Sequence, residues 1–362
     1  MKREPAVKAS IHVWAPDIIG YAGGLQKHLY SICLAVQDLL KGGRVKIISK
    51  SNTVSFIFAL KILLRYLLDR PDLIIVGHVH FCPVAYMIKR LFKTPFWIVA
   101  YGIESWDIQN DSIRKSLLAS NRILSMSSFT KNRIAGEQNI KADKISVLPG
   151  TFDANLFKIK PKPGQLLDKY GLNGKQPVIL TVCRLDKGEK YKGYDRIIEA
   201  LPRLIQYFPD IRYVLVGEGS DTERIEELVS SLKLDKYVIL PGKVTGEELC
   251  DHYNLCDVFA MPSRGEGFGI VFIEALACGK PVLAGNKDGS VDALCSGELG
   301  VLVDPDDINE ISDNLIKILK REHPNKIIYD PELLRAKVIE YFGFDKFRMT
   351  LGQYLKDVET LC

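Results

Sequence analysis

Short hydrophobic blocks alternate with longer amphipathic stretches along the whole chain. Several blocks, such as 73–76 and 213–216, are apolar throughout, as expected for parallel strands that are covered on both faces. The blocks predict strands at 9–15, 44–50, 72–78, 95–101, 121–126, 144–149, 177–183, 211–217, 236–241, 257–261, 281–284 and 300–303. The stretches between them predict helices, among them 25–40, 83–93, 127–138, 194–208, 221–233, 246–254, 268–278 and 306–321. This regular alternation predicts an α/β protein with doubly wound parallel sheets.

The length of 362 residues exceeds what one ordinary core needs and fits two domains of roughly 150–180 residues. Between the two series of strands, the segment 158–164 combines prolines with lysines, a composition suited to a solvated linker. We therefore expect one Rossmann-like domain over 1–160 and a second over 161–343, with a C-terminal helix at about 344–362 packing back on the first. Two such domains leave a cleft between them, and ligands of these folds bind beyond the carboxyl ends of the strands.

The overall composition, 47% hydrophobic and 26% charged, is typical of a soluble globular protein. No stretch reaches the ~18–20 uninterrupted apolar residues of a bilayer span, because the best candidate, 54–68, contains Lys61 and Arg65. The N-terminus lacks the apolar core of a secretory signal, and the eight cysteines form no C-x-x-C pair. These features predict a cytoplasmic protein without disulfides or structural zinc.

Charge is divided unevenly between the two halves. Residues 1–170 hold 25 Lys+Arg and 12 Asp+Glu, a balance of +13, whereas residues 171–362 hold 24 and 32, a balance of −8. A basic first half suits a phosphorylated acceptor or an anionic membrane surface, although ordinary solubilising charge explains it equally well. Lys61 and Arg65 fit an interfacial helix or a core helix with snorkelling cations.

Two segments have the composition of phosphate-binding loops. Gly23-Gly24 follows the first predicted strand, where glycines allow backbone to approach a ligand, although a plain turn accounts for the pair as well. Arg184 ends the strand at 177–183, and Lys192-Gly193 leads into the next helix. The forked guanidinium and the point charge of lysine together suit a diphosphate, with a solvated basic loop as the alternative.

A third segment, 262–275, places two carboxylates around a glycine-rich helix start. Glu266 lies in the loop after the strand at 257–261, and Glu274 lies within a strongly apolar helix. A carboxylate on such a helix costs free energy unless it has a partner, and the hydroxyls of a sugar or ribose supply partners. A capped helix with one buried ion pair is the structural alternative.

With these motifs in place, the whole chain resembles the family-4 retaining glycosyltransferases of GT-B fold, a group that includes bacterial polysaccharide and lipid-glycan transferases. The matched positions are Gly23-Gly24 for the N-terminal glycine loop, Arg184 with Lys192-Gly193 for the R…KG pair, and Glu266 with Glu274 for the E-x7-E signature. They occur in the family's usual order, which makes a chance match improbable. The resemblance implies two Rossmann-like domains, an acceptor-binding one followed by a donor-binding one.

The resemblance also implies roles in binding a nucleotide-sugar donor. Arg184 and Lys192 would hold the diphosphate, and Glu274 the ribose hydroxyls. Glu266 would hold the donor sugar together with the backbone of four consecutive residues, Gly267, Phe268, Gly269 and Ile270. The remaining donor-binding positions would be Gly24 and the loop Gly242, Lys243 and Val244, which frames the base. No metal and no other cofactor is expected, since cationic side chains and helix ends stabilise the leaving diphosphate.

Two departures from the family pattern affect the expected site. The family often has His-Gly-x-Glu after the fifth N-terminal strand, with the histidine near the reacting sugar, and this chain has Tyr101-Gly-Ile-Glu104. His78 and His80, at the end of the preceding strand, are the alternative histidines. We therefore predict Glu266, His78 and Tyr101 as catalytic residues and His80 and Glu104 as acceptor-binding residues.

The second departure is Asp288-Gly-Ser-Val-Asp292, where G-G-x-P-E is usual, and Asp292 can still accept hydrogen bonds there. Asp304-Pro-Asp306 has the form of a metal-binding D-x-D motif. Its position between a strand and a helix favours turn and N-cap chemistry instead.

Together these residues predict a retaining hexosyltransferase of polysaccharide biosynthesis. The donor would be a UDP-hexose, with UDP-glucose first and GDP-mannose second. The acceptor would be a glycan or a lipid-diphosphate-linked glycan, handled in the cytoplasm or at the inner face of the plasma membrane, with an anionic membrane surface as a further partner and no nucleic acid. The alternatives are a nucleotide-sugar epimerase of the same fold and a non-catalytic glycan-binding relative.

Overall fold

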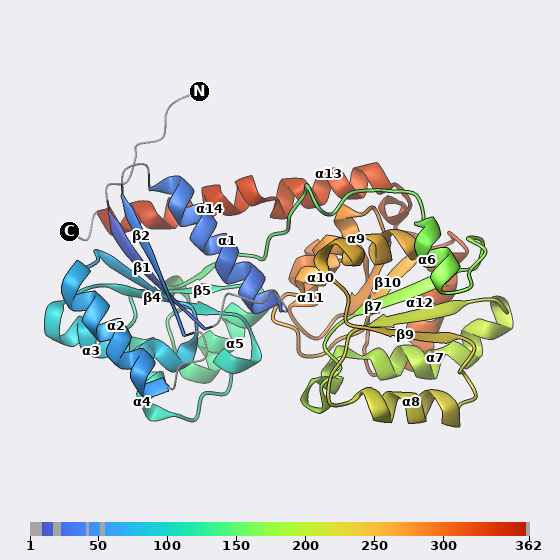
Figure 1. The fold of residues 1–362 in the computed structure, drawn as a ribbon, viewed down its shortest axis with the longest axis horizontal. Coiled ribbons are helices and arrows are strands. Elements are labelled where there is room, and N and C mark those ends of the chain that lie inside the picture. Colours follow the sequence, from blue (N-terminus) through green and yellow to red (C-terminus); the bar gives the residue numbers. More distant parts are fainter. Residues whose placement is uncertain (1–8, 17–22, 41–42, 51–54, 360–362) are drawn as a thin grey trace. The chain divides into compact units, whose positions relative to one another are not determined.

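A computed structural model describes residues 9–16, 23–40, 43–50 and 55–359. The chain divides into two units (Figure 1). The first unit runs to Thr151 and takes up the chain again from Phe344, and the second unit is Phe152–Gly343.

The first unit is built on a six-stranded sheet, all of whose pairings are parallel, with strand order β2-β1-β3-β4-β5-β6. Its strands are β1 (Ser10–Ala15), β2 (Arg44–Ser49), β3 (Leu73–Val76), β4 (Phe96–Ala100), β5 (Arg122–Ser125) and β6 (Ile145–Val147). Its helices are α1 (Gly24–Leu39), α2 (Ser55–Asp69), α3 (Cys82–Phe92), α4 (Asp111–Ala119), α5 (Ser128–Gln138) and α14 (Phe344–Glu359). Because parallel crossovers are right-handed, α1 covers one face of the sheet and α2 to α5 cover the other.

The second unit repeats this plan with the order β12-β11-β10-β7-β8-β9, again all parallel. Its strands are β7 (Val178–Val182), β8 (Arg212–Val216), β9 (Val238–Gly242), β10 (Val258–Met261), β11 (Val282–Gly285) and β12 (Val301–Val303). Its helices are α6 (Gly164–Lys169), α7 (Tyr194–Tyr207), α8 (Thr222–Ser231), α9 (Gly246–Leu255), α10 (Ile270–Ala277), α11 (Ser290–Ala293), α12 (Ile308–Leu319) and α13 (Pro331–Phe342). Residues of α7, α8 and α12 form one core cluster on one face of this sheet, and α10 packs against α13.

Local sequence explains where several helices begin. Ser127 accepts the Thr130 N–H at the start of α5, and Thr245 forms a capping box with Glu248 at the start of α9. Each cap satisfies backbone N–H groups that have no partner within the helix. Both predicted parallel sheets are present, which confirms the predicted α/β fold class.

The predicted linker 158–164 lies within the second unit and is held to α9 and its end. Lys160 N–H donates to Asn254 Oδ1 at 2.8 Å, and Lys160 Nζ lies 3.1 Å from Asp251 Oδ1. Lys162 Nζ lies 2.8 Å from Asp257 Oδ2. The lysines that suggested a solvated connection therefore serve as partners for acidic residues of this unit.

Helix α14 closes the first unit from the far end of the sequence. It packs along α1, and Tyr354 Oη donates to the Val147 carbonyl of β6 at 2.8 Å. Phe347 of α14 meets the His28 ring of α1 edge-on, with 5.4 Å between ring centroids. Helix α14 is thus part of the first unit's core.

Candidate functional site

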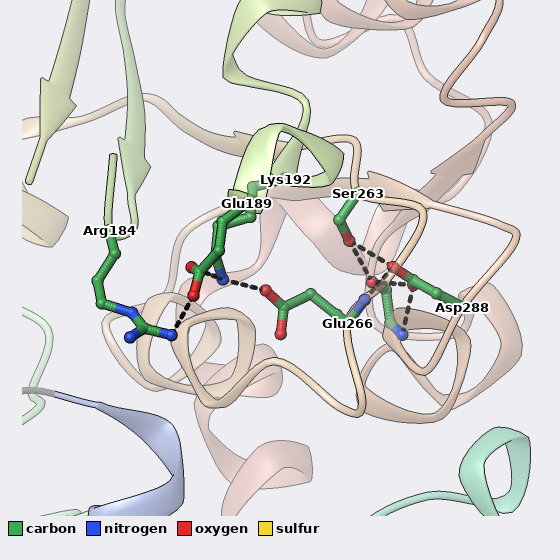
Figure 2. Close-up of polar contacts among 7 residues, drawn as sticks. Arg184, Glu189, Lys192, Ser263, Glu266 and Asp288 are labelled. Atoms are coloured by element: carbon green, nitrogen blue, oxygen red, sulfur yellow. Dashed lines mark hydrogen bonds and ion pairs between the residues drawn. The ribbon is translucent and has the colours of Figure 1, made fainter. Parts of the chain in front are cut away.

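The second unit brings its motif residues together where the strand order reverses. β7 and β10 are neighbours in the sheet, but the chain leaves β7 toward β8 and leaves β10 toward β11. In open parallel sheets such a switch point opens a crevice at the carboxyl ends of the strands, and ligands bind there. The loops after β7, β10 and β11 meet at this edge (Figure 2).

The loop after β7 ends in the 3-10 helix η4 (Lys187–Lys192) and Gly193. Gly193 has φ +77°, and a Cβ atom there would lie 2.2 Å from the Pro262 carbonyl oxygen of the loop after β10. The close approach of the two loops therefore requires glycine after Lys192. Lys192 Nζ lies 2.5 Å from Glu266 Oε1, with both side chains about seven-eighths buried.

A chain of alternating charges crosses this edge (Figure 2). Arg184, whose side chain is 68% exposed, pairs with Glu189, and Glu189 Oε2 also lies 3.6 Å from Lys192 Nζ. Burial is the largest single influence on the pKa of Lys192 and lowers it, but the surrounding groups, led by the carboxylate of Glu266, together raise that pKa above its ordinary value. Lys192 is therefore a protonated cation at neutral pH.

Asp288 is buried and accepts hydrogen bonds from both loops around Glu266. Its Oδ2 accepts from Ser263 Oγ and from the Glu266 N–H, both at 2.7 Å, and its Oδ1 accepts from the Ser290 N–H at 2.9 Å and from Ser290 Oγ. Burial raises the pKa of Asp288, and these hydrogen bonds oppose that shift. A Cβ on Gly289 would lie 2.1 Å from the Gly267 carbonyl oxygen, so the β11 loop presses directly on the β10 loop.

Glu274 lies inside α10 and is almost fully buried. Its Oε2 accepts a hydrogen bond from Tyr253 Oη of α9 at 3.0 Å. The tyrosine supplies the partner that the apolar helix itself lacks. The ribose-binding role of Glu274 stays a prediction.

The predicted sugar-binding backbone, 267–270, forms the entry to α10. Gly269 has φ +83° and is the N-cap, with no side chain capping the helix. The side chains of Phe268 and Ile270 are buried in the core and hold this backbone in place. The first N–H groups of α10 therefore make a helix N-terminus of the kind that favours anionic or polar ligands.

The predicted base-framing loop follows β9 at the same edge of the sheet. Gly242 has φ +78°, and a Cβ added there would meet no atom within 4 Å. Lys243 is exposed and Val244 is half-buried. The structure places this loop beside β8, on the other side of β7 from Glu266.

In the first unit, His78 and His80 line a cavity of about 480 Å³ at the carboxyl ends of β1, β2 and β3. The other lining residues are Pro16, Lys50, Phe58, Ala59, Ile62, Phe81 and Val84. His78 Nδ1 accepts from the His80 N–H at 3.3 Å, and the two rings pack 4.7 Å apart. Burial, with the positive charges of His80 and Lys50, lowers the pKa of His78 to about 4, so His78 is neutral at neutral pH.

Tyr101 and Glu104 stabilise the backbone at the end of β4 through side-chain hydrogen bonds. Tyr101 is buried, and its Oη donates to the Gly77 carbonyl at 3.2 Å. Burial raises the pKa of Tyr101 well above its ordinary value, with Glu104 and Cys33 adding to the shift. Glu104 Oε1 accepts the N–H groups of Tyr101 and Gly102 at 2.7 and 3.2 Å. Gly24 is exposed at the start of α1, and Tyr21 and Ala22 before the glycine pair lie outside the described residues.

Asp304 and Asp306 act in the turn before α12. Lys287 Nζ lies 2.6 Å from Asp304 Oδ1 and 3.0 Å from Asp306 Oδ2, and Arg264 also pairs with Asp306. The N-cap of α12 is the next residue, Asp307. Among the described residues, no group of three or more His, Cys, Asp and Glu side chains is placed to hold a metal ion.

Residues 165–332, which contain this edge of the second unit, match the family model described as glycosyl transferases group 1. The motif residues at the switch point all fall within the match, from Arg184 to Asp288. The second unit is a group 1 glycosyl transferase domain.

Relatives of known name resemble about half of this chain. The chain is 34% identical over 195 residues to the GDP-mannose-dependent alpha-(1-6)-phosphatidylinositol monomannoside mannosyltransferase of Mycolicibacterium smegmatis, covering 52% of this chain and 50% of that protein. It is 31% identical over 196 residues to the mannosylfructose-phosphate synthase of Agrobacterium fabrum, covering 51% and 42%. These matches thus span about half, or less, of the length of the relatives.

Solved structures extend the likeness to the fold of the whole chain. HepE of Anabaena in complex with UDP matches with a TM-score of 0.79 at 19% identity, covering 96% of this chain and 100% of that chain. The sucrose-phosphate synthase of Thermosynechococcus elongatus matches with a TM-score of 0.82 at 19% identity, covering 98% and 100%. The chain therefore has the GT-B fold, as predicted.

Two carboxylates of the glycosyl transferase domain, Glu189 and Asp288, were not predicted from the sequence. Glu189 sits in a lysine-rich loop whose cations drew attention, and nothing in the sequence indicates that it turns inward. Asp288 does carry a local signal, because Asp-Gly-Ser in the loop that follows a strand is typical of a side-chain-capped turn. The sequence indicated Asp292 as the hydrogen-bond acceptor of that turn, whereas in the structure Asp288 accepts the hydrogen bonds that join the loops.

Proposed function

We propose that the chain is a retaining hexosyltransferase that uses a nucleoside diphosphate sugar as donor and a hydroxyl of a glycan or lipid-linked glycan as acceptor. The observation that carries the proposal is the Lys192–Glu266 pair at the switch point of the second sheet. It places a protonated amine and a carboxylate side by side at the entry to α10. A diphosphate and a sugar present the complementary groups at adjacent positions.

Each part of the donor has a partner at this edge. The diphosphate binds Arg184 and Lys192, each of which neutralises one of its negative charges. The sugar hydroxyls bind Glu266 and the N–H groups at the start of α10. Glu274 binds the ribose, and the loop 242–244 frames the base. For Gly24 of the first unit, the donor-binding role stays a prediction that the family resemblance implies.

The transfer breaks the bond between the anomeric carbon and the phosphate oxygen and forms a bond from the same carbon to the acceptor oxygen. The acceptor proton passes to an oxygen of the leaving phosphate, so no covalent glycosyl–protein intermediate forms and configuration is retained. Lys192 and Arg184 stabilise the negative charge that develops on the diphosphate. These cations and the α10 N-terminus do this work in the proposal without a metal ion or another cofactor.

The names of the relatives bear on the choice of donor. A relative sharing 34% identity is GDP-mannose-dependent, whereas the UDP-bound HepE shares 19%. On the strength of the higher identity, GDP-mannose becomes the favoured donor and UDP-glucose the second. Backbone contacts from the 242–244 loop would select the base.

The acceptor is proposed to bind the first unit at the cavity lined by His78 and His80. His78 is neutral at neutral pH, and because its Nδ1 accepts from the His80 N–H, its Nε2–H can donate a hydrogen bond to an oxygen of the acceptor. Tyr101 and Glu104 contribute by holding the end of β4 in place, given their hydrogen bonds to backbone. A lipid-linked acceptor would place the chain at the cytoplasmic face of the membrane, in polysaccharide or lipid-glycan biosynthesis.

The Glu266→Ala variant tests the function directly. Transfer from GDP-mannose or UDP-glucose should fall at least a hundredfold, while the affinity for the free nucleoside diphosphate changes less than about threefold, because Glu266 contacts the sugar and not the diphosphate. Product analysis by mass spectrometry, with donor alone and with donor plus acceptor, makes the measurement.

Full transfer activity in Glu266→Ala would contradict the assignment of Glu266. A new sugar nucleotide formed from donor alone would identify an epimerase instead. Nucleotide binding without transfer or donor hydrolysis in the unaltered protein would identify a non-catalytic relative.

A further inference from the structure

Helix α2 is apolar on both of its faces. Its inner face packs into the core through Phe58, Ile62 and Tyr66, each no more than 2% exposed. Its outer face carries large apolar side chains at helical spacing: Ile57 (52% exposed), Leu60 (59%), Leu64 (58%), Leu67 (47%) and Leu68 (68%). A helix between a core and water normally has a polar outer face, so this face has the composition of a covered surface. No part of the chain that the structure describes covers it.

The apolar surface continues onto the end of α3. Met87, Leu91 and Phe92 are exposed there. The Phe92 ring packs against the Tyr66 ring of α2 with 5.1 Å between centroids, which joins the two helices at this point. We call the exposed apolar residues of α2 and α3 together the α2–α3 surface.

Apart from Asp69, the charged residues of α2 and α3 are cations. Lys61 and Arg65 lie exposed on α2, and Arg90 lies exposed near the end of α3. The sole acid within either helix is Asp69, and it lies 2.5 Å from Lys46 Nζ of β2. Exposed leucines interleaved with cations are the pattern of a helix that lies in the interface of an anionic bilayer.

We propose that the α2–α3 surface docks the chain onto an anionic lipid bilayer. The leucines enter the boundary between headgroups and acyl chains, and the cations contact the lipid phosphates. A second copy of this chain is a poorer occupant, because a two-fold contact through this surface would set Lys61 and Arg65 against identical cations. Among the described residues, no helix is long and apolar enough to cross a membrane, so docking along the interface is the mode the structure allows them.

The location of the surface relates docking to the proposed acceptor site. Phe58, Ala59 and Ile62 of α2 form one wall of the cavity that His78 and His80 also line. The opposite side of the same helical turns carries Leu60 and Leu64. Docking through α2 would therefore hold the cavity within one helix diameter, about 10 Å, of the lipid headgroups.

Sedimentation of the full chain with large vesicles tests the proposal. Vesicles of phosphatidylcholine alone are compared with vesicles containing 30 mol% phosphatidylglycerol, at low and high salt. We expect binding to the anionic vesicles that weakens as salt is raised, since screening shortens the reach of the cations.

Two double variants change the surface without touching buried residues. Leu60→Gln/Leu64→Gln should lower vesicle affinity at least tenfold, and Lys61→Gln/Arg65→Gln about 25-fold, at roughly fivefold per cation. The matched controls are Leu333→Gln/Ile339→Gln, exposed apolar positions of α13, and Lys233→Gln/Lys236→Gln after α8. Both controls should stay within twofold of the unaltered protein.

Equal vesicle binding by the surface variants and the controls would overturn the proposal, as would equally tight binding to neutral vesicles. A dimer of the free protein that the Leu60→Gln/Leu64→Gln variant abolishes would also overturn it and show that a second copy covers the surface. Nucleoside diphosphate affinity is measured on the same variants and should be unchanged. A failure of docking is thereby distinguished from a failure of the proposed transferase function, on which docking does not depend.

Discussion

At the scale of single residues, Glu189 places a negative charge between the two cations proposed for the diphosphate. It pairs with Arg184 and lies 3.6 Å from Lys192 Nζ. A bound diphosphate would compete with this carboxylate for both cations. In the proposed donor site, Glu189 would therefore be a counter-ion that the diphosphate displaces.

Replacing Glu189 with glutamine should tighten nucleoside diphosphate binding. The amide keeps the length of the side chain but removes the competing charge, and we expect about fivefold lower Kd, or ~1 kcal/mol. Isothermal titration with GDP and UDP measures it. Asp313→Asn, which breaks the Arg203–Asp313 pair elsewhere on the second unit, serves as the control and should leave Kd unchanged. Weaker binding in Glu189→Gln would show that the carboxylate supports the site instead of competing for it.

Asp288 accepts hydrogen bonds from four donors, more than a neutral amide can satisfy. In Asp288→Asn one oxygen becomes an NH2 group that faces donors, so we expect unfolding to become easier by ~1–3 kcal/mol. Since one donor is the Glu266 N–H, the rate of transfer should fall as well. Urea unfolding and kcat are the measurements, and Asp304→Asn, at an exposed ion pair, should change unfolding by less than ~0.5 kcal/mol. Equal changes in unfolding free energy and in kcat for the two variants would show that Asp288 does not stabilise the loops around Glu266.

Sequence motifs identified Lys192 and Glu266, which the structure brings together, but they did not identify the residues whose contacts form only in the tertiary fold. Lys192 and Glu266 could be predicted because glycines and strand ends surround them. The ion pair that joins them crosses two loops 74 positions apart, and spacing alone does not reveal it. Tyr253, the partner of Glu274, reads in the sequence as an ordinary apolar position of a helix, and its hydroxyl acquires a role only when α9 and α10 pack together.

At the scale of elements, His28 lies where α1, the end of β4 and α14 meet. It is fully buried, and among the described residues neither ring nitrogen has a hydrogen-bond partner. The rings of Tyr101 and Phe347 pack edge-on against it. Burial lowers the pKa of His28 to about 3, so the imidazole is neutral in the folded protein.

This burial makes the stability of the first unit depend on pH. The unfolded chain takes up a proton on His28 below about pH 6.5 and the folded chain only near pH 3, so the stabilising difference is complete above pH 6.5 and is lost as pH falls. The free energy of unfolding should lose up to ~1.4 kcal/mol per pH unit in that window through His28. His28→Leu should flatten this slope in urea unfolding measured at pH 7.5, 5.5 and 4.5. An equal pH dependence of the unfolding free energy in His28→Leu and the unaltered protein would show that His28 is not the source of the slope.

The strands could be predicted from the sequence, since each predicted strand corresponds to an observed one within a few residues. The blocks succeed because a parallel strand buried on both faces must be apolar throughout. The partners of the helices were harder to predict. The apolar stretch around Lys61 and Arg65 reads equally as a core helix or an interfacial one, and the exposure of Leu60 and Leu64 favours the interfacial interpretation.

At the scale of the whole molecule, the two halves of the chain carry opposite charge. The balance is +13 over residues 1–170 and −8 over residues 171–362. An anionic nucleotide that binds the acidic half gains no help from net charge and depends on local cations. Lys192 and Arg184 at the switch point supply them, which makes nucleotide affinity a sensitive reporter of the proposed site.

The most direct test of the account is titration of GDP, UDP and ADP into the full chain and its Lys192→Ala variant. We expect one nucleotide site per chain and a preference for GDP or UDP over ADP. In Lys192→Ala we expect the nucleotide affinity to fall at least tenfold. Removing Lys192 leaves Glu189 facing the diphosphate without the buried cation that partly offsets its charge. Equal affinity of both proteins for all three nucleotides would contradict the placement of the donor diphosphate at the switch point of the second sheet.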